Sequence, residues 1–184
     1  MTIRLANAGD AAAIAAIYAP FVVDSAASFE TEAPSIAEVG ARIAGGGELY
    51  PWFVALDEAG AVAGYAYACA FRARPAYRFA VETSVYVAAD AHGRGIGRRL
   101  YETLLPLLEA QGFTQAIAAI TMPNAPSVKL HERLGFALAG TYRDVGYKLG
   151  AWRSVALWQR ALAPRVDPPP EPRPFASIPD NQRP

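Results

Sequence analysis

The sequence has few of the residues on which metal sites and disulfide frameworks depend. Among its 184 residues are one cysteine, Cys69, and two histidines, His92 and His131. A single thiol forms no intramolecular disulfide, and one thiolate with two imidazoles is too small a set for a structural zinc site. We therefore expect no bound metal and a reducing, cytoplasmic compartment.

Net charge and long apolar runs are also missing. Seventeen basic residues balance seventeen acidic ones, whereas proteins that bind nucleic acids or anionic membranes usually carry a basic surplus. The apolar run at residues 11–23 is interrupted by Pro20, and it falls short of the about 20 residues that span a bilayer as a helix. Neither nucleic acid nor membrane is an expected partner.

Apolar residues, in contrast, make up 53% of the chain, which suits one folded domain with a single core. The prolines are unevenly placed, because eight of the fifteen fall in residues 163–184. Proline removes a backbone donor and fixes φ. We therefore predict a domain at residues 1–162 and an extended or disordered tail at residues 163–184, with a proline-rich ligand for a partner domain as the alternative.

Helical and strand periodicities alternate before this tail. The patterns predict strands at residues 3–6, 52–56, 62–70, 80–87, 116–121, 138–147 and 154–160. Helices are expected after Asp10 and Ser35, from Ile96 and after Asn124, with Asp10 as a cap and Pro106 as a kink in the third helix. Helices inserted between strands, followed by an antiparallel finish, indicate a mixed α/β fold.

A glycine-rich turn at residues 92–97 joins the strand at 80–87 to the next helix. Its glycines are Gly93, Gly95 and Gly97, and the arginines in and after it are Arg94, Arg98 and Arg99. Such a turn directs backbone amides inward, and the helix N-terminus adds partial positive charge. The pattern predicts a cradle for a pyrophosphate, with a plain tight turn and solvated arginines as the alternative.

Two common nucleotide-binding loops do not fit this turn. A Walker loop needs Gly-Lys-Ser or Gly-Lys-Thr, and neither tripeptide follows. A dinucleotide-binding turn follows the first strand and spaces its third glycine further along.

Several segments, taken in order, carry a family resemblance. They are Ala27-Ser28-Phe29-Glu30-Thr31, Phe71-Arg72-Ala73-Arg74 with Tyr77, Val81 to Val87, the glycine turn, Asn124 to Ser127, Leu130 to Phe136, and Gly146-Tyr147-Lys148 with Trp152. Residues 87–97 resemble the acyl-CoA pyrophosphate motif of the GNAT superfamily of N-acetyltransferases, with His92 where Gln or Arg is usual. Together the segments resemble the phosphinothricin and methionine sulfoximine acetyltransferases across residues 3–162.

The resemblance implies a GNAT-type fold, with a central, mixed and twisted sheet flanked by helices, and a homodimer. It implies acetyl-CoA as co-substrate and direct transfer, in a ternary complex, to the amine of phosphinothricin, methionine sulfoximine or methionine sulfone. The residues expected to hold acetyl-CoA are Val85, Tyr86, Val87, Gly93, Arg94, Gly95, Ile96, Gly97, Arg98 and Asn124.

Two residues are candidates for moving protons in this reaction. Glu82 lies on the polar face of an alternating strand just before the glycine turn, where a carboxylate can deprotonate the amine directly or through water. His131 occupies the place where many GNAT enzymes have a tyrosine that protonates the departing thiolate. The alternatives are a solvated or ion-paired glutamate and a packed histidine whose ring bonds a carbonyl at the end of a helix.

Residues for the acceptor are expected on two segments. Arg72 and Arg74 alternate along a strand edge, so both guanidiniums are expected to project the same way and to grip a carboxylate or phosphinate. A solvated basic edge is the alternative. The resemblance adds Phe29, Tyr77 and Ser84 to the acceptor site.

Other functions remain open at this point. Within the same fold, another small amine or a protein N-terminus is the alternative acceptor. A non-catalytic acyl-CoA-binding sensor would keep the glycine turn but would need neither Glu82 nor His131.

Overall fold

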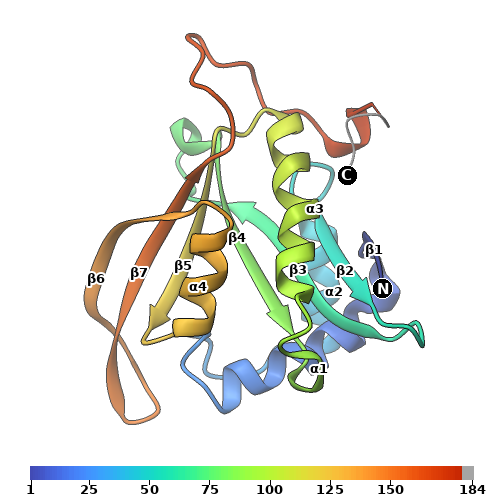
Figure 1. Ribbon diagram of the computed structural model, residues 1–184, viewed down its shortest axis with the longest axis vertical. Coiled ribbons are helices and arrows are strands. Elements are labelled where there is room, and N and C mark those ends of the chain that lie inside the picture. The colour runs from blue at the N-terminus through green and yellow to red at the C-terminus, as the bar shows by residue number, and fades with distance from the viewer. Residues whose placement is uncertain (180–184) are drawn as a thin grey trace.

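A seven-stranded sheet forms the centre of the computed structural model, which describes residues 1–179 (Figure 1). The strands are β1 (Thr2–Leu5), β2 (Trp52–Leu56), β3 (Val62–Ala70), β4 (Ala80–Val87), β5 (Gln115–Met122), β6 (Ala137–Lys148) and β7 (Ala151–Ala161). Their order across the sheet is β1-β2-β3-β4-β5-β7-β6. Only β4 and β5 pair in parallel, and all the other neighbours are antiparallel. The predicted mixed α/β class is confirmed.

Helices cover the two faces of this sheet. They are α1 (Ala11–Val23), α2 (Ile36–Gly45), α3 (Ile96–Gln111) and α4 (Ala125–Arg133). The alternation of β2 separates two cores, because Phe53 packs in the core built on α3 while Val54 packs in the core built on α1 and α2. No helix within residues 1–179 is long and apolar enough to cross a bilayer.

The strands predicted at 52–56, 62–70 and 80–87 are confirmed to the residue, and the other strands differ by a few residues at their ends. One expectation about the helices is wrong. The side chain of Asp10 does not cap α1; it accepts hydrogen bonds from Arg4 and from the Asn7 amide. Helix α3 continues past Pro106 to Gln111, with Pro106 on its exposed side, and a kink at Pro106 stays a prediction.

The pairing of β4 with β5 is short. It pairs Ala80 with Gln115, Val81 with Ala116 and Glu82 with Ile117, and it ends there. Beyond this point β4 continues along β3 and β5 continues along β7, so that the two strands diverge (Figure 1). A parting of two central strands leaves an opening into the sheet, with α3 and α4 beside it.

Residues 163–179, which we name the C-terminal strap, differ from the expected disorder. Their chain is packed past the C-terminal end of α3 (Figure 1). Glu171 accepts two hydrogen bonds from the Arg78 guanidinium at 2.6 and 2.7 Å, and the Arg173 amide donates to the Gln111 carbonyl at 2.7 Å. Ile178 is 1% exposed and belongs to the core on α3. Residues 180–184 of the predicted tail lie outside the described residues, and the domain boundary after Leu162 stays a prediction.

Replacing Ile178 with alanine tests whether the strap contributes to the core. We expect the free energy of unfolding to fall by about 2–4 kcal/mol, because buried methyl groups are lost and a cavity remains. Val166→Ala is the matched control, since Val166 lies in the same strap but is 57% exposed, and it should change stability by less than about 0.5 kcal/mol. Urea unfolding measures both, and equal stabilities of the two variants would contradict a packed strap.

Candidate active site

A cleft of about 800 Å³ opens where β4 and β5 part. Its walls come from β4, β5, the glycine turn, the first turn of α3 and one side of α4. The predicted site residues that line it are Ser84, Val85, Tyr86, Val87, Gly93, Gly95, Ile96, Gly97, Arg98, Asn124 and His131. Most of the residues expected to hold acetyl-CoA therefore share one cavity.

The glycine turn has the backbone that its sequence requires. Gly93 and Gly95 have φ values of +77° and +76°, in the left-handed region that favours glycine. Gly95 is also the N-cap residue of α3, which begins at Ile96, and the first amides of a helix have no acceptor within it. These amides and the helix dipole suit a phosphate group at the cleft wall.

The arginines of this segment divide between the cleft and its surroundings. Arg98 lines the cleft and pairs with Glu102 at 2.7 Å. Arg94 is outside the lining, and its guanidinium donates to the Asp90 carbonyl at 3.0 Å. Only part of the positive charge expected from the sequence therefore faces the cavity.

The strand β4 offers backbone groups to the same cavity. In an antiparallel pair, alternate residues direct their amide and carbonyl groups to each side of the strand. Past Glu82, the groups that point away from β3 face the opening instead of β5. A bound ligand can accept from and donate to these groups as an added strand would, which fits the amide-rich arm of acetyl-CoA.

His131 is buried, at 3% exposure, and its ring is held at both nitrogens. Nδ1 lies 2.8 Å from the Ser127 carbonyl, and Nε2 lies 3.1 Å from the Tyr101 hydroxyl. Burial lowers the pKa of His131, so the ring is neutral near pH 7. A carbonyl only accepts, so Nδ1 carries the proton and Nε2 accepts from Tyr101.

His131 is packed and bonded to a carbonyl, as the alternative reading expects, and it also lines the cleft, as a catalytic residue must.

Glu82 lies where the two strands part, paired across the sheet with Cys69 on one side and Ile117 on the other. It is not among the residues that line the cleft. Its side chain is half-buried, and this burial raises the pKa of the carboxyl while the nearby charge of Arg72 lowers it. A raised pKa makes a carboxylate a better proton acceptor.

The arginine pair is placed differently from the prediction. Strand β3 ends at Ala70, so Arg72 and Arg74 lie in an exposed loop and not along a strand edge. The guanidinium of Arg72 lies 4.5 Å from the centre of the Phe71 ring. The two side chains therefore lie in the same loop, but no strand geometry aligns them.

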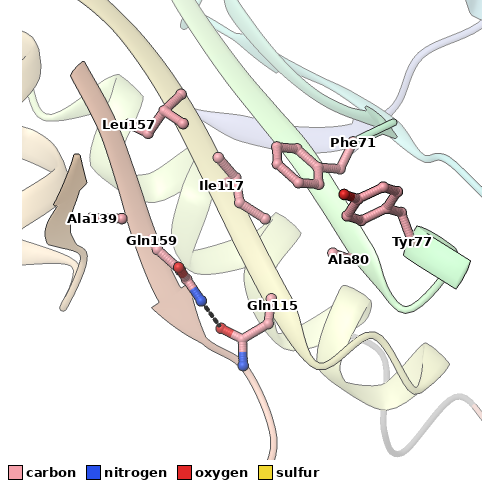
Figure 2. A pocket seen from close by; sticks show the side chains of 8 residues that line it. All are labelled: Phe71, Tyr77, Ala80, Gln115, Ile117, Ala139, Leu157 and Gln159. Carbon is pink, nitrogen blue, oxygen red and sulfur yellow. Dashed lines mark hydrogen bonds between the residues drawn. The ribbon is translucent and has the colours of Figure 1, made fainter. Parts of the chain in front are cut away.

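Tyr77 lines a second, smaller cavity of about 170 Å³ (Figure 2). Its ring meets the Phe71 ring edge-on at 5.7 Å, and the floor is formed by residues of β4, β5 and β7. Ile117, which pairs with Glu82 across the sheet, also lines this cavity.

Phe29 lies against a different element. Its ring occupies the space where a Cβ on Gly146 of β6 would be, so a side chain at that position would displace the ring. Phe29 itself is 40% exposed and is not part of the cleft lining.

The sequence analysis did not identify Tyr101 as part of the site. Tyr101 is fully buried, lines the cleft, and lies 3.1 Å from His131 and 3.4 Å from Thr83 through its hydroxyl. Because Tyr101 follows Leu100 and precedes Leu104 in an apolar helical pattern, the sequence indicates only a core residue at this position. The signal was the hydroxyl itself, because a buried hydroxyl requires a partner.

Comparisons with known proteins agree on one family. The model of the acetyltransferase (GNAT) domain matches residues 3–155. The phosphinothricin N-acetyltransferase of Streptomyces viridochromogenes is 43% identical over 177 residues, 96% of this chain and 95% of its own length. The L-methionine sulfoximine/L-methionine sulfone acetyltransferase of Pseudomonas paraeruginosa is 37% identical, over 91% of this chain and 98% of its own.

Solved structures are similar as well. A GNAT superfamily phosphinothricin acetyltransferase from Sinorhizobium meliloti, crystallised in complex with acetyl-CoA, is 45% identical with a TM-score of 0.85. The match covers 88% of each chain.

Tyr101→Phe tests the contact between the tyrosine hydroxyl and His131. We expect the free energy of unfolding to fall by about 1–3 kcal/mol, because the buried Nε2 of His131 loses its hydrogen-bond donor. Tyr142→Phe is the matched control, since Tyr142 is 50% exposed on β6. Urea unfolding measures the stability of both variants. Equal stabilities would show that the hydrogen bond between the Tyr101 hydroxyl and His131 does not stabilise the fold.

Proposed function

This chain belongs to the GNAT acetyltransferase family, and on that basis we propose that it transfers the acetyl group of acetyl-CoA to the amine of a small amino-acid-like acceptor. Phosphinothricin, methionine sulfoximine and methionine sulfone are the proposed acceptors, after the names of the relatives. The observation that carries the proposal is the cleft between β4 and β5, with the glycine turn at one end and His131 in its wall.

The residues of this chain fit acetyl-CoA through backbone groups more than through side chains. When bound, acetyl-CoA supplies the acetyl group as a thioester. The glycine turn and the start of α3 would hold its pyrophosphate, and the open side of β4 would hold its amide-rich arm. Asn124 caps α4, where its side chain accepts from the Ser127 amide at 3.2 Å, and it presents its remaining amide group at the cleft wall.

Glu82 is the proposed base. Its carboxylate accepts a proton from the acceptor's ammonium group, so that the neutral amine is available for acetylation. Support comes from its position in the last pair between β4 and β5, where the cleft begins, and from the nearby charge of Arg72. Burial makes this carboxylate more basic, and a single water molecule would carry the proton across any remaining gap.

His131 and Tyr101 are the proposed source of the proton for the departing sulfur. The neutral ring and the hydroxyl share one hydrogen bond at the cleft wall. The proton comes from the Tyr101 hydroxyl, which water in the cleft reprotonates afterwards, while Nδ1–H of His131 stays on the Ser127 carbonyl and Nε2 holds the hydroxyl in place. The thiol of CoA then leaves as a neutral group.

Arg72 and Arg74 are the proposed ligands of the acceptor's carboxylate or phosphinate. Both are exposed, the charge of Arg72 acts on the Glu82 carboxyl, and guanidinium groups bind such anions through paired hydrogen bonds. Phe29, Tyr77 and Ser84 are proposed as further contacts of the acceptor. Ser84 lies two residues along β4 from Glu82, on the same side of the strand.

A homodimer and a cytoplasmic location are also proposed. Support for the dimer comes from β6 and β7, where exposed apolar side chains gather: Leu138, Tyr142, Val145, Tyr147, Leu149 and Trp152. An apolar surface of this kind is typical of an interface. The location is supported by the single cysteine.

Release of CoA thiol from acetyl-CoA tests the activity. We expect purified protein to release thiol with L-methionine sulfoximine or phosphinothricin, and not with polyamines or most ordinary amino acids. The Arg72→Ala/Arg74→Ala double variant should raise the KM of the acceptor at least tenfold, the loss of about one charged hydrogen-bonded contact, with the KM of acetyl-CoA unchanged.

Two results would contradict these proposals. Unchanged acceptor KM in the double variant would remove the arginines from the site. If the protein binds acetyl-CoA but releases no thiol with any of these acceptors, the result would favour an acyl-CoA sensor, or an enzyme whose acceptor is a protein N-terminus.

Glu82→Gln tests the base. Because the carboxylate must be unprotonated to accept a proton, kcat/KM should rise with pH through a midpoint above 4.5, the ordinary pKa of a glutamate. The glutamine variant should lose this pH dependence and about 100-fold or more of kcat. Glu58→Gln, in an exposed turn, should behave as the parent, and a glutamine variant that keeps the same acidic limb would exclude Glu82 as the base.

A further inference from the structure

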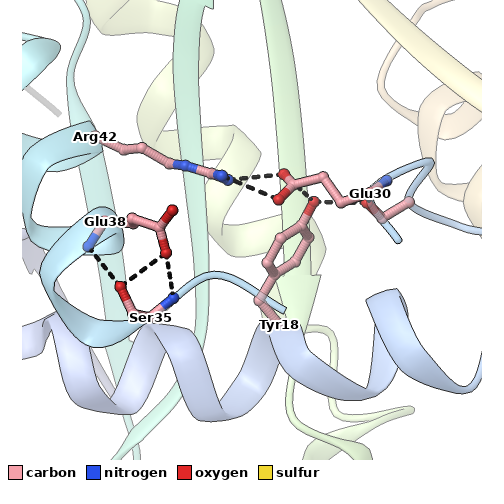
Figure 3. A network of polar contacts seen from close by, with 6 residues as sticks. Tyr18, Glu30, Ser35, Glu38 and Arg42 are labelled. Carbon is pink, nitrogen blue, oxygen red and sulfur yellow. Dashed lines mark hydrogen bonds and ion pairs between the residues drawn. The ribbon is translucent and has the colours of Figure 1, made fainter. Parts of the chain in front are cut away.

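A polar cluster fixes the loop between α1 and α2, which spans residues 24–35. We name this cluster the loop anchor; its members are Tyr18 of α1, Ser28 and Glu30 of the loop, Arg42 of α2 and Lys148 of β6. Figure 3 shows the side chains of Tyr18, Glu30 and Arg42 converging above α1. The loop carries Ala27, which lines the cleft, and Phe29, a proposed contact of the acceptor.

The carboxylate of Glu30 is the centre of the anchor. It accepts two hydrogen bonds from the Arg42 guanidinium, at 2.7 and 2.9 Å, and one from the Tyr18 hydroxyl at 2.9 Å. Arg42 lowers the pKa of this carboxyl, so Glu30 is charged at neutral pH. One side chain therefore joins the loop to both helices that flank it.

A second hydrogen-bonded contact connects the loop to strand β6. The ammonium group of Lys148 donates to the Ser28 carbonyl at 2.6 Å, and the Ser28 hydroxyl lies 2.7 Å from the Tyr18 hydroxyl. Lys148 is 8% exposed, and a charge so covered is costly unless it has partners. Burial lowers the pKa of Lys148, and the negative charge of Glu30 opposes this shift by favouring the ammonium form.

These ties determine where Phe29 lies. Ser28 and Glu30 flank it on both sides, and its ring rests on the backbone of Gly146, two residues before Lys148. The ends of the loop are fixed separately, because Ser25 donates to the Phe21 carbonyl and Ser35 forms a capping box with Glu38 (Figure 3). The middle of the loop therefore depends on the anchor.

We propose that the loop anchor positions the acceptor, and that Glu30 is its principal positioning residue. By holding Phe29 against β6, it shapes the wall that an amino-acid acceptor meets. None of its members lines the cleft, so the binding of acetyl-CoA does not depend on it. This inference rests on the proposed function, because it assumes that the acceptor enters beside this loop.

Glu30→Gln tests the proposal with two readouts. Hydrogen exchange of the amides in residues 26–32 should become faster, while exchange at residues 91–98 stays unchanged. With methionine sulfone as acceptor, the KM for the acceptor should rise about five- to tenfold, because a misplaced wall weakens binding, whereas kcat and the KM for acetyl-CoA stay within about twofold. Glu32→Gln is the matched control, an exposed carboxylate of the same loop.

Charge exchange distinguishes the ion pair from other effects of the substitution. Glu30→Arg and Arg42→Glu should each raise the acceptor KM, and the double variant should recover at least half of the loss. Unchanged hydrogen exchange in Glu30→Gln would overturn the proposal, and so would faster exchange with an unchanged acceptor KM. If the parent protein binds acetyl-CoA but acetylates no small amine, the proposed function fails, while faster exchange in Glu30→Gln would still show that Glu30 holds the loop.

Discussion

The short pairing of β4 with β5 is the constraint on which the rest of the site depends. Each strand has a complete partner on its outer side, β3 and β7, so the sheet remains intact although its centre opens after Glu82. Open strand edges carry backbone groups that need partners. The parting is tolerated because water or a ligand can supply those partners, and the same geometry places the start of α3 at one end of the opening and α4 along its side.

Burial shifts the pKa values of the two proposed proton-transfer groups, Glu82 and His131, in opposite directions. Desolvation disfavours charge, so it raises the pKa of Glu82 and lowers the pKa of His131. The carboxylate becomes a stronger base, while the imidazole remains neutral and is tied to Tyr101.

The features predicted correctly from the sequence are those with local causes. The alternation of residues 80–87 and the left-handed glycines of the turn follow from side-chain period and from sterics, which act over a few residues. What the sequence analysis missed depends on partners outside the local pattern. Arg4 binds the carboxylate of Asp10, which therefore does not cap α1. Gln111 and Arg78 hold the proline-rich strap, and the contact of Tyr101 with His131 joins two helices.

The division of labour between backbone and side chains explains how one fold serves several acceptors. Pyrophosphate and pantetheine are the same for every enzyme that uses acetyl-CoA, and their proposed contacts here are glycines, helix amides and an open strand edge. The proposed acceptor contacts instead lie on loops, Phe29 between α1 and α2 and Arg72 and Arg74 after β3. Loop residues vary at little cost to the core, and the relatives that share 35–43% identity carry the names of different acceptors. A polar anchor that holds such a loop therefore confers precision without restricting which side chain the loop presents.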